Sequence, residues 1–307
     1  KYYKGLGTST SKEFKEYFKN KKLVYFVNDE KGDDIIDMVF NKKRANDRKT
    51  WLGNYDRTLK LNTNNTSVSY TEFVDKEMIH FSKYDNDRSI PNILDGLKKS
   101  LRKILFSAFK KNLTTEIKVA QFSGYVSEHS GYHHGEASLN GAIVNMAQNY
   151  VGSNNINLFM PNGQFGTRLQ GGKDSASERY IFTMLNPVTR KIYLKEDDQV
   201  YDYIDDDGQI VEPVFYAPII PMILVNGSKG IGTGFSTDIP CYNPKTLINK
   251  IKFKLGKTEE DPELIPFYKN FKGIITKVDT HKYMCQGVYE KPKPNYIKIT
   301  ELPIGVW

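Results

Sequence analysis

Cysteine, tryptophan and long apolar runs are scarce in this sequence of 307 residues. Its two cysteines, Cys241 and Cys285, match neither a disulfide framework nor a zinc-binding spacing, so we expect a reducing compartment. No apolar stretch approaches the length that a helix needs to cross a bilayer, and a membrane is therefore not expected as a partner.

A starting methionine and a leader peptide are also missing. The sequence opens Lys-Tyr-Tyr-Lys-Gly-Leu-Gly, without the charged start, apolar centre and small-residue cleavage site of a signal peptide. We expect a piece of a longer protein, large enough to hold two or three modules.

Acidic residues are outnumbered by basic ones. The 44 Lys and Arg against 36 Asp and Glu give a formal charge of +8 and a pI near 9.1. Such an excess favours a polyanionic partner, although many ordinary basic proteins share it.

Residues 171–183, Gly-Gly-Lys-Asp-Ser-Ala-Ser-Glu-Arg-Tyr-Ile-Phe-Thr, combine a nucleophile with positive charge and flexible backbone. The phenol of Tyr180 needs nearby positive charge or a base to become reactive. Arg179 precedes it, and a guanidinium can stabilise charge that develops on an attacked phosphate. The alternative is a half-buried structural tyrosine that happens to follow an arginine.

Residues 88–112 carry a helical pattern. Its apolar positions are Leu97, Leu101, Ile104, Leu105 and Ala108. Its basic positions, expected on the opposite side, are Lys98, Lys99, Arg102 and Lys103. One face would be buried and the other offered to a phosphate backbone, unless the charged face is only solvated.

A second helix is predicted after residues 130–136. Leu139, Ile143 and Met146 continue the helical period. His133 and His134 would lie at the start of this helix, where free amide groups and the helix dipole favour an anion. Adjacent histidines have the wrong spacing to converge on one metal ion, and structural histidines are the remaining alternative.

The two helices, followed by extended runs at residues 155–160 and 179–185, indicate a helix-turn-helix with a β-wing. Further along, Asp-Asp-Asp-Gly at 205–208 suits a hairpin turn. It lacks the distant glutamate of a calcium-binding loop.

Residues 216–235 predict an apolar strand before a glycine-rich loop. The glycine spacing fits neither a Walker loop nor a dinucleotide fingerprint, so close approach to a macromolecule is the better interpretation. Ile231, between two glycines, could be an exposed wedge that inserts between base pairs or a buried residue of a tight turn.

The N-terminal part predicts a capped helix from Ser-Thr-Ser-Lys-Glu at 9–13, preceded by a turn at Gly5-Leu6-Gly7. The polar run at 62–67 is expected to be a loop or linker.

Several of these segments together resemble the DNA breakage-and-reunion core of type IIA DNA topoisomerases, closest to the eukaryotic and large-DNA-virus type II enzymes. The resemblance runs from end to end, and the number and order of the motifs carry it. They are Tyr-Lys-Gly-Leu-Gly-Thr at 3–8, Arg-Ser-Ile-Pro at 88–91, Asp-Gly-Leu-Lys at 95–98, Lys-Val-Ala-Gln at 118–121, Tyr-His-His-Gly-Glu at 132–136, Val-Gly-Ser-Asn-Asn at 151–155, Gln-Phe-Gly-Thr-Arg at 164–168, Gly-Gly-Lys-Asp at 171–174, Arg-Tyr-Ile at 179–181 and Asn-Gly-Ser-Lys-Gly-Ile-Gly-Thr-Gly at 226–234.

The resemblance implies that Tyr180 attacks a DNA phosphodiester and leaves a 5′-phosphotyrosyl link. Arg179 would lie beside the nucleophile, with Arg88 and His134 supporting the scissile phosphate and His133 close by. Double-stranded DNA is the expected partner, and the residues expected to bind it are Ile231, Lys98, Arg102, Lys103, Gln164, Arg168 and Lys173.

The implied fold is α+β and multidomain. Residues 1–27 would end a TOPRIM domain, 28–69 would connect, 70–235 would form a winged-helix domain with the tyrosine, and 236–307 would begin an α/β tower domain.

The resemblance further implies a homodimer and a nuclear or viral-factory location. Mg²⁺ would be held by TOPRIM carboxylates, and ATP by an ATPase domain, both outside this chain, which itself would hold no metal. We therefore expect a cleavage and religation core. As the alternative, the isolated chain would be a DNA-binding winged-helix module without cleavage activity.

Overall fold

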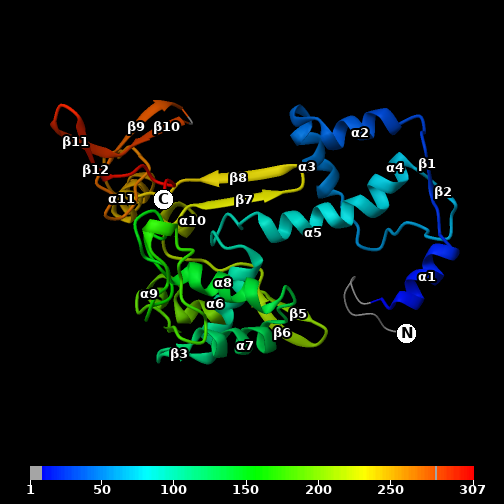
Figure 1. Cartoon of the computed structure of the whole chain (residues 1–307), viewed down its shortest axis with the longest axis horizontal. Helices are drawn as coiled ribbons and strands as arrows, with labels where there is room; N and C mark the ends of the chain where they lie inside the picture. Colours follow the sequence, from blue (N-terminus) through cyan, green and yellow to red (C-terminus); the bar gives the residue numbers. More distant parts are fainter. Residues whose placement is uncertain (1–8, 281) are drawn as a thin grey trace. The chain divides into compact units, whose positions relative to one another are not determined.

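The computed structural model describes residues 9–280 and 282–307 (Figure 1). It divides into two compact units. Unit 1 comprises Lys1–Asp85 with Thr233–Phe235, and unit 2 comprises Asn86–Gly232 with Ser236–Trp307. Both contain helices together with paired strands, which agrees with the expected mixture of α and β structure.

Unit 1 begins, among its described residues, with the predicted capped helix. Thr10 accepts a hydrogen bond from the Glu13 N–H, and the Glu13 carboxylate accepts one from the Thr10 N–H, so a reciprocal capping box fixes the start of the helix. The turn predicted at Gly5-Leu6-Gly7 lies outside the described residues. The elements of the unit are α1 (Ser11–Lys19), β1 (Tyr25–Val27), α2 (Gly32–Phe40), η1 (Lys42–Arg44), α3 (Ala45–Gly53), β2 (Ser67–Ser69), α4 (Tyr70–Phe73), the π-turn η2 (Val74–Met78) and most of α5 (Ile79–Ser89).

The core of unit 1 is small. Strands β1 and β2 pair in parallel, and Met38, Val39 and Val74 form a buried cluster. Arg48 is buried as well, and its guanidinium donates to the carbonyl oxygens of Met38 and Asn41. Residues 28–69, expected to connect two domains, thus contribute α2 and α3 to a folded unit, while residues 62–66 form the expected loop.

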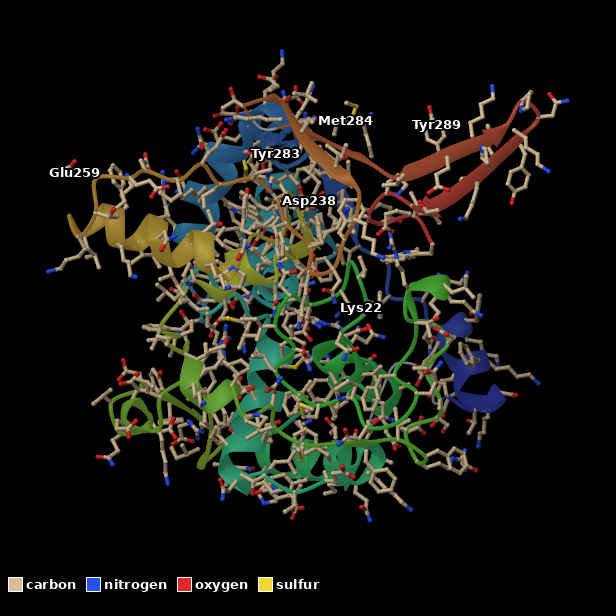
Figure 2. All side chains as sticks on the ribbon, turned by 90° about the vertical axis from the view of Figure 1, so that its left-hand side faces the viewer. Lys22, Asp238, Glu259, Tyr283, Met284 and Tyr289 are labelled. Carbon is tan, nitrogen blue, oxygen red and sulfur yellow. The ribbon has the colours of Figure 1, made fainter. Side chains whose placement is uncertain are left out.

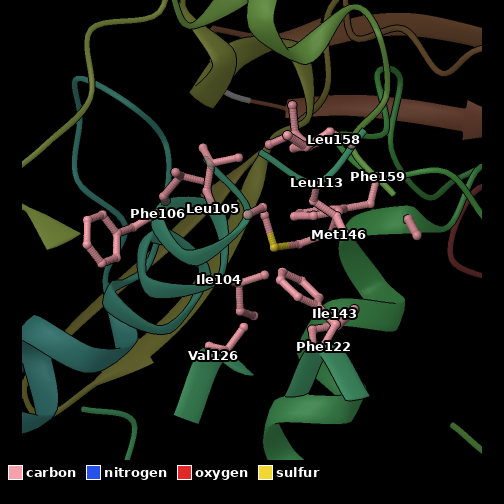
Figure 3. Packing of buried hydrophobic residues seen from close by; sticks show 14 of the residues in the cluster. Ile104, Leu105, Phe106, Leu113, Phe122, Val126, Ile143, Met146, Leu158 and Phe159 are labelled. Carbon is pink, nitrogen blue, oxygen red and sulfur yellow. The ribbon is translucent and has the colours of Figure 1, made fainter. Parts of the chain in front are cut away.

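Unit 2 is built on three helices that enclose its main core (Figure 3). The elements of the unit are α6 (Lys99–Lys111), β3 (Ile117–Lys118), α7 (Val119–Ser130), α8 (Glu136–Ala147), η3 (Arg168–Gln170), β4 (Phe182–Thr183), α9 (Thr189–Ile192), η4 (Lys195–Gln199), β5 (Tyr203–Asp206), β6 (Gln209–Pro213), α10 (Met222–Val225), β7 (Ser228–Gly232), β8 (Phe235–Ile239), α11 (Pro244–Lys254), β9 (Ile274–Asp279), β10 (Lys282–Gln286), β11 (Val288–Lys293) and β12 (Tyr296–Glu301).

Helices α6 and α8 are the two predicted helices, and their apolar stripes meet in the core. Ile104 on α6 and Ile143 on α8 are fully buried, together with Phe122 on the intervening α7 (Figure 3). Sequence reasoning missed α7, because Gly124 and several serines interrupt the apolar pattern that its buried residues follow.

The acidic run at 205–208 forms the predicted hairpin turn between β5 and β6. Asp207 and Gly208 both have positive φ, at 53° and 86°, which a glycine adopts without strain and an aspartate tolerates in such turns. The apolar strand predicted within 216–225 is wrong, however. Its last residues form the short helix α10 after Pro221, because proline offers no N–H to a strand ladder and suits the start of a helix.

The rest of unit 2 consists of helix α11 and further hairpins. In Figure 2, Tyr289 on β11 projects away from the ribbon of the β11–β12 hairpin. The side-chain amide of Asn155 donates to the carbonyl oxygens of Val225, Tyr242 and Phe267, at 2.9, 3.1 and 3.0 Å. One buried asparagine therefore ties both ends of the β7–β8 hairpin to the segment that follows α11.

Candidate active site

The backbone around Tyr180 is fixed on both sides. The Glu178 carbonyl accepts a hydrogen bond from the Ala120 N–H at 3.1 Å, and the Ile181 carbonyl accepts one from the Val119 N–H at 3.0 Å, both at the start of α7. Ile181 is buried in the core, whereas the Tyr180 side chain is 72% exposed. The alternation of apolar and polar residues here anchors the segment through Ile181 and directs the phenol to the surface.

Arg179 supplies a positive charge next to this phenol. Its guanidinium carbon lies 5.8 Å from the centre of the Tyr180 ring, and its Nε donates weakly to the Ser177 hydroxyl at 3.4 Å. The side chain is exposed, so a bound anion can reach it. The predicted pair is thus accessible, and the half-buried alternative for Tyr180 is wrong.

His133 and His134 occupy the turn that leads into α8, as predicted. Gly135 caps the helix with φ of 85°, a conformation that disfavours other residues. His134 stands edge-on to Tyr132, with ring centres 5.5 Å apart. Burial lowers the pKa of His134, and the positive charges of Arg88 and His133 lower it further.

The lowered pKa of His134 reveals a local excess of positive charge. Besides Arg88 and His133, the lysines Lys99 and Lys103 act on this imidazole in the same direction. Arg88, at the end of α5, is exposed, and so are His133 and Lys99. Because this cluster precedes the N-terminus of α8, it has the charge and the donors of an anion site.

Ile231 lies on β7 with its side chain 78% exposed. The buried alternative for this residue is therefore wrong. An exposed isoleucine at the outer part of a hairpin has the shape of an apolar wedge, and its neighbour Gly230 is packed closely enough that an added Cβ would lie 2.1 Å from the Ser89 carbonyl oxygen.

The structure corrects the placement of two basic residues on α6. Arg102 and Lys103 were expected on an outer face, yet both are buried. Arg102 pairs with the fully buried Asp95 through Nε at 2.7 Å and Nη2 at 3.0 Å, and Lys103 pairs with the fully buried Glu212 at 2.6 Å. Their charges are used inside the protein, because a buried carboxylate requires a paired cation.

The other residues predicted to bind DNA have different surroundings. Lys173 and Gln164 are exposed in or beside the loop that precedes Tyr180, and the Gln164 carbonyl accepts the Ala176 N–H at 2.9 Å. Lys98 caps α6 and is half-buried, which lowers its pKa. Arg168 is bound to Glu301 and to the Leu302 carbonyl oxygen.

A groove that sequence reasoning missed runs along α8, with a volume of about 600 Å³. It is lined by one face of α8 and by the loop before Tyr180, including Asn140 and Ser175. The Asn140 Oδ1 is buried and accepts no hydrogen bond from the described residues. No residue pattern announces this groove, since its two walls are about 35 residues apart in the sequence.

Metal ligands do not gather anywhere in the part of the chain that the structure describes. No group of three or more His, Cys, Asp or Glu side chains there could hold an ion. The described residues therefore do not fit a Mg²⁺ site, and no chemical step below passes through a metal. Within the same residues, none of the helices combines the length and the apolar character required to span a membrane.

Comparison with known families decides the assignment. A family model described as DNA gyrase/topoisomerase IV, for the A-type subunit, matches residues 88–307. The chain belongs to this family. A second model, the C-terminal associated domain of TOPRIM, matches residues 1–86, and the predicted membership of the type IIA topoisomerases is confirmed.

The similar proteins share the same description. DNA topoisomerase 2 of Arabidopsis thaliana is 52% identical over 314 residues, and that of Drosophila melanogaster is 49% identical over 322 residues. Each alignment covers all of this chain but only 21% and 22% of the relative, so the chain spans about a fifth of their length.

A solved structure is similar over the whole chain. It is described as the Plasmodium falciparum topoisomerase II DNA-binding, cleavage and re-ligation domain, with a TM-score of 0.80 and 50% identity. The match covers 100% of this chain and 42% of that one.

Proposed function

We propose that this chain forms part of the DNA cleavage and religation core of a type II DNA topoisomerase. The observation that carries the proposal is Tyr180, an exposed phenol on a backbone that hydrogen bonds fix on both sides, with Arg179 next to it. The names of the similar proteins support the same function.

In the proposed reaction, the Tyr180 Oη forms a bond to the phosphorus of a DNA phosphodiester. The bond from phosphorus to the 3′ oxygen breaks, which leaves a 5′-phosphotyrosyl link and a free 3′-hydroxyl. The phenol loses one proton and the 3′ oxygen gains one, so the protons balance. Religation is the reverse, and it needs no external energy because the link conserves the phosphodiester bond.

Positive charge and hydrogen-bond donors supply the electrostatic part of the mechanism. Arg179 stabilises the negative charge that develops on the attacked phosphate, and Arg88 and His134 support the same phosphate from the turn before α8. His134 has a lowered pKa, so near neutral pH its imidazole is mostly uncharged and donates one N–H to a phosphate oxygen.

Further contacts would hold and bend the duplex. We propose that Ile231 inserts between base pairs, since its side chain is exposed on a hairpin. Lys98, Gln164 and Lys173 would contact the backbone. Arg102 and Lys103 are assigned to the interior instead, because each is already paired with a buried carboxylate.

We propose the following division of the chain. A winged-helix domain contains α6, α7 and α8 together with Tyr180, and a tower domain begins near residue 236. The structural division at Asp85 and Asn86, and the family model that ends at residue 86, support a start of the winged-helix domain near residue 86 rather than 70. Residues before this point would belong with TOPRIM.

The complete enzyme would act as a homodimer on double-stranded DNA in the nucleus or a viral factory. Mg²⁺ and ATP are assigned to other parts of that enzyme. The test uses the complete enzyme with supercoiled plasmid, Mg²⁺ and ATP. We expect relaxation, and protein linked to 5′ ends after detergent trapping. A Tyr180→Phe variant that still formed this adduct would overturn the proposal, while its unchanged melting temperature would confirm that it folds.

A further inference from the structure

Arg168 and Glu301 are joined although they are 133 residues apart in the sequence. The Arg168 guanidinium pairs with the Glu301 carboxylate through Nη1, and its Nη2 donates to the Leu302 carbonyl oxygen at 2.7 Å. The other Glu301 oxygen accepts the Lys272 N–H at 3.0 Å. Burial raises the pKa of Glu301, but the hydrogen bonds from Lys272 and Arg168 outweigh it, so the pKa is lowered overall.

Trp307 reinforces this connection. Its indole lies edge-on to the ring of Tyr150, with centres 5.8 Å apart. It also covers Gly171: a Cβ at that position would lie 2.7 Å from the indole Cδ1 and Nε1. Residues 301–307 therefore hold the loop that contains Arg168 and Gly171 at two points, one ionic and one apolar.

The same loop continues directly into the Tyr180 segment. It is closed on itself by Asp174, whose carboxylate accepts the Thr167 N–H at 2.8 Å and the Thr167 hydroxyl at 2.7 Å. Beyond it, the Ala176 N–H donates to the Gln164 carbonyl oxygen. A displacement of Arg168 would thus be transmitted through hydrogen-bonded backbone to the residues that precede Tyr180.

We propose that Arg168, Glu301 and Trp307 are positioning residues for Tyr180. In this role Arg168 acts through Glu301 and does not contact DNA, contrary to the expectation from the sequence. The proposal rests on the proposed function of Tyr180. Its physical basis is that an arginine released to a phosphate would leave the buried Glu301 carboxylate without its cation. The terminal part of unit 2 would therefore set the position of the nucleophile.

The test compares Arg168→Met, Glu301→Gln and the double variant in the complete enzyme, with Lys173→Met as the control for a residue of the same loop proposed to contact phosphate. Two quantities are measured: the cleavage rate at saturating concentration of a DNA duplex, and the salt dependence of DNA binding. A positioning role predicts that each single variant slows cleavage about ten- to a hundredfold, as a displacement near 1 Å can. The double variant should be no slower than either single one.

The salt dependence separates positioning from DNA contact. We expect Arg168→Met to leave the slope of affinity against salt unchanged, whereas Lys173→Met lowers it by about one phosphate contact. The inference is overturned if Arg168→Met lowers the slope by about one while Glu301→Gln cleaves normally, or if the two single effects multiply in the double variant.

Hydrogen exchange gives a second readout that does not depend on activity. In Glu301→Gln we expect faster exchange in residues 164–176 and wild-type protection in α6 and α8; unchanged exchange in the loop would contradict the inference. If the wild-type enzyme formed no tyrosyl adduct, the proposed function itself would fail. An adduct in the wild type with wild-type behaviour in all the variants would refute only the positioning role.

Discussion

Two sets of arginines and lysines in unit 2 have the same chemistry and opposite surroundings. Arg102 and Lys103 are buried, each against a fully buried carboxylate. Arg88 and Arg179 are exposed, one beside His134 and one beside Tyr180. The comparison teaches that a basic residue near a candidate site is free for phosphate only where the fold has not already paired it.

The buried set explains the motif Asp-Gly-Leu-Lys at 95–98. Besides Arg102, the Asp95 carboxylate accepts the N–H groups of Leu97 at 2.8 Å and Tyr216 at 3.0 Å. One aspartate therefore fixes the entry to α6 and joins it to a distant segment. This motif contributes to the site through the fold, by placing α6 against α7 and α8.

The largest expected effect comes from breaking the buried set. Arg102→Met leaves the Asp95 carboxylate buried without its cation, and we expect the free energy of unfolding to fall by about 3–5 kcal/mol. Urea unfolding of the variant measures this change. A loss below about 1 kcal/mol would show that Arg102 is not required inside and would restore it as a candidate for DNA contact.

Arg179→Gln should give the opposite profile. The side chain is exposed, so stability should change by no more than about 0.5 kcal/mol, while loss of one stabilising donor should slow DNA cleavage about 10²–10³-fold. Cleavage rates at saturating DNA, together with thermal unfolding, provide the measurement. Normal cleavage by this variant would remove Arg179 from the proposed mechanism.

How far sequence could predict this contrast follows from particular residues. Helical spacing located α6 and α8, and the pairing of Arg179 with Tyr180 identified the exposed site, because both signals are local. The interior positions of Arg102 and Lys103 depend on carboxylates that come from outside the helix, and Lys103 and Glu212 are 109 residues apart. The Arg168–Glu301 pair was missed for the same reason, since a single sequence does not show long-range pairing.

A smaller effect is expected from an exposed lysine of the tyrosine loop. Lys173→Met should reduce the salt dependence of DNA affinity by about one phosphate contact and leave stability unchanged. Lys195→Met, on η4, is the matched control because Lys195 is also exposed and is not predicted to contact DNA. Equal slopes for the two variants would show that Lys173 makes no such contact.

The smallest effect concerns pH. Burial and nearby cations lower the pKa of His134 below 6.5, so its protonation is opposed in the free protein, and stability falls as pH drops below about 6.5. A bound phosphate relieves part of this opposition. DNA affinity should therefore rise by a factor on the order of three between pH 7.5 and pH 6, and His134→Gln should remove the rise.

Fluorescence titrations with a labelled duplex at constant salt measure this pH dependence. His129→Gln is the control, because His129 stacks on Tyr125 with ring centres 3.9 Å apart and is not assigned to phosphate. Should the rise persist in His134→Gln and vanish in His129→Gln, the anion site would have to be placed elsewhere.

The most direct test is to identify which tyrosine carries the DNA. The chain contains 20 tyrosines, and only Tyr180 is proposed as the nucleophile. The complete enzyme, trapped on DNA with detergent and digested with nuclease and protease, should yield one nucleotide-bearing peptide, with the phosphate on Tyr180. A modified peptide that contains any other tyrosine, with residues 174–190 recovered unmodified, would contradict the proposed function.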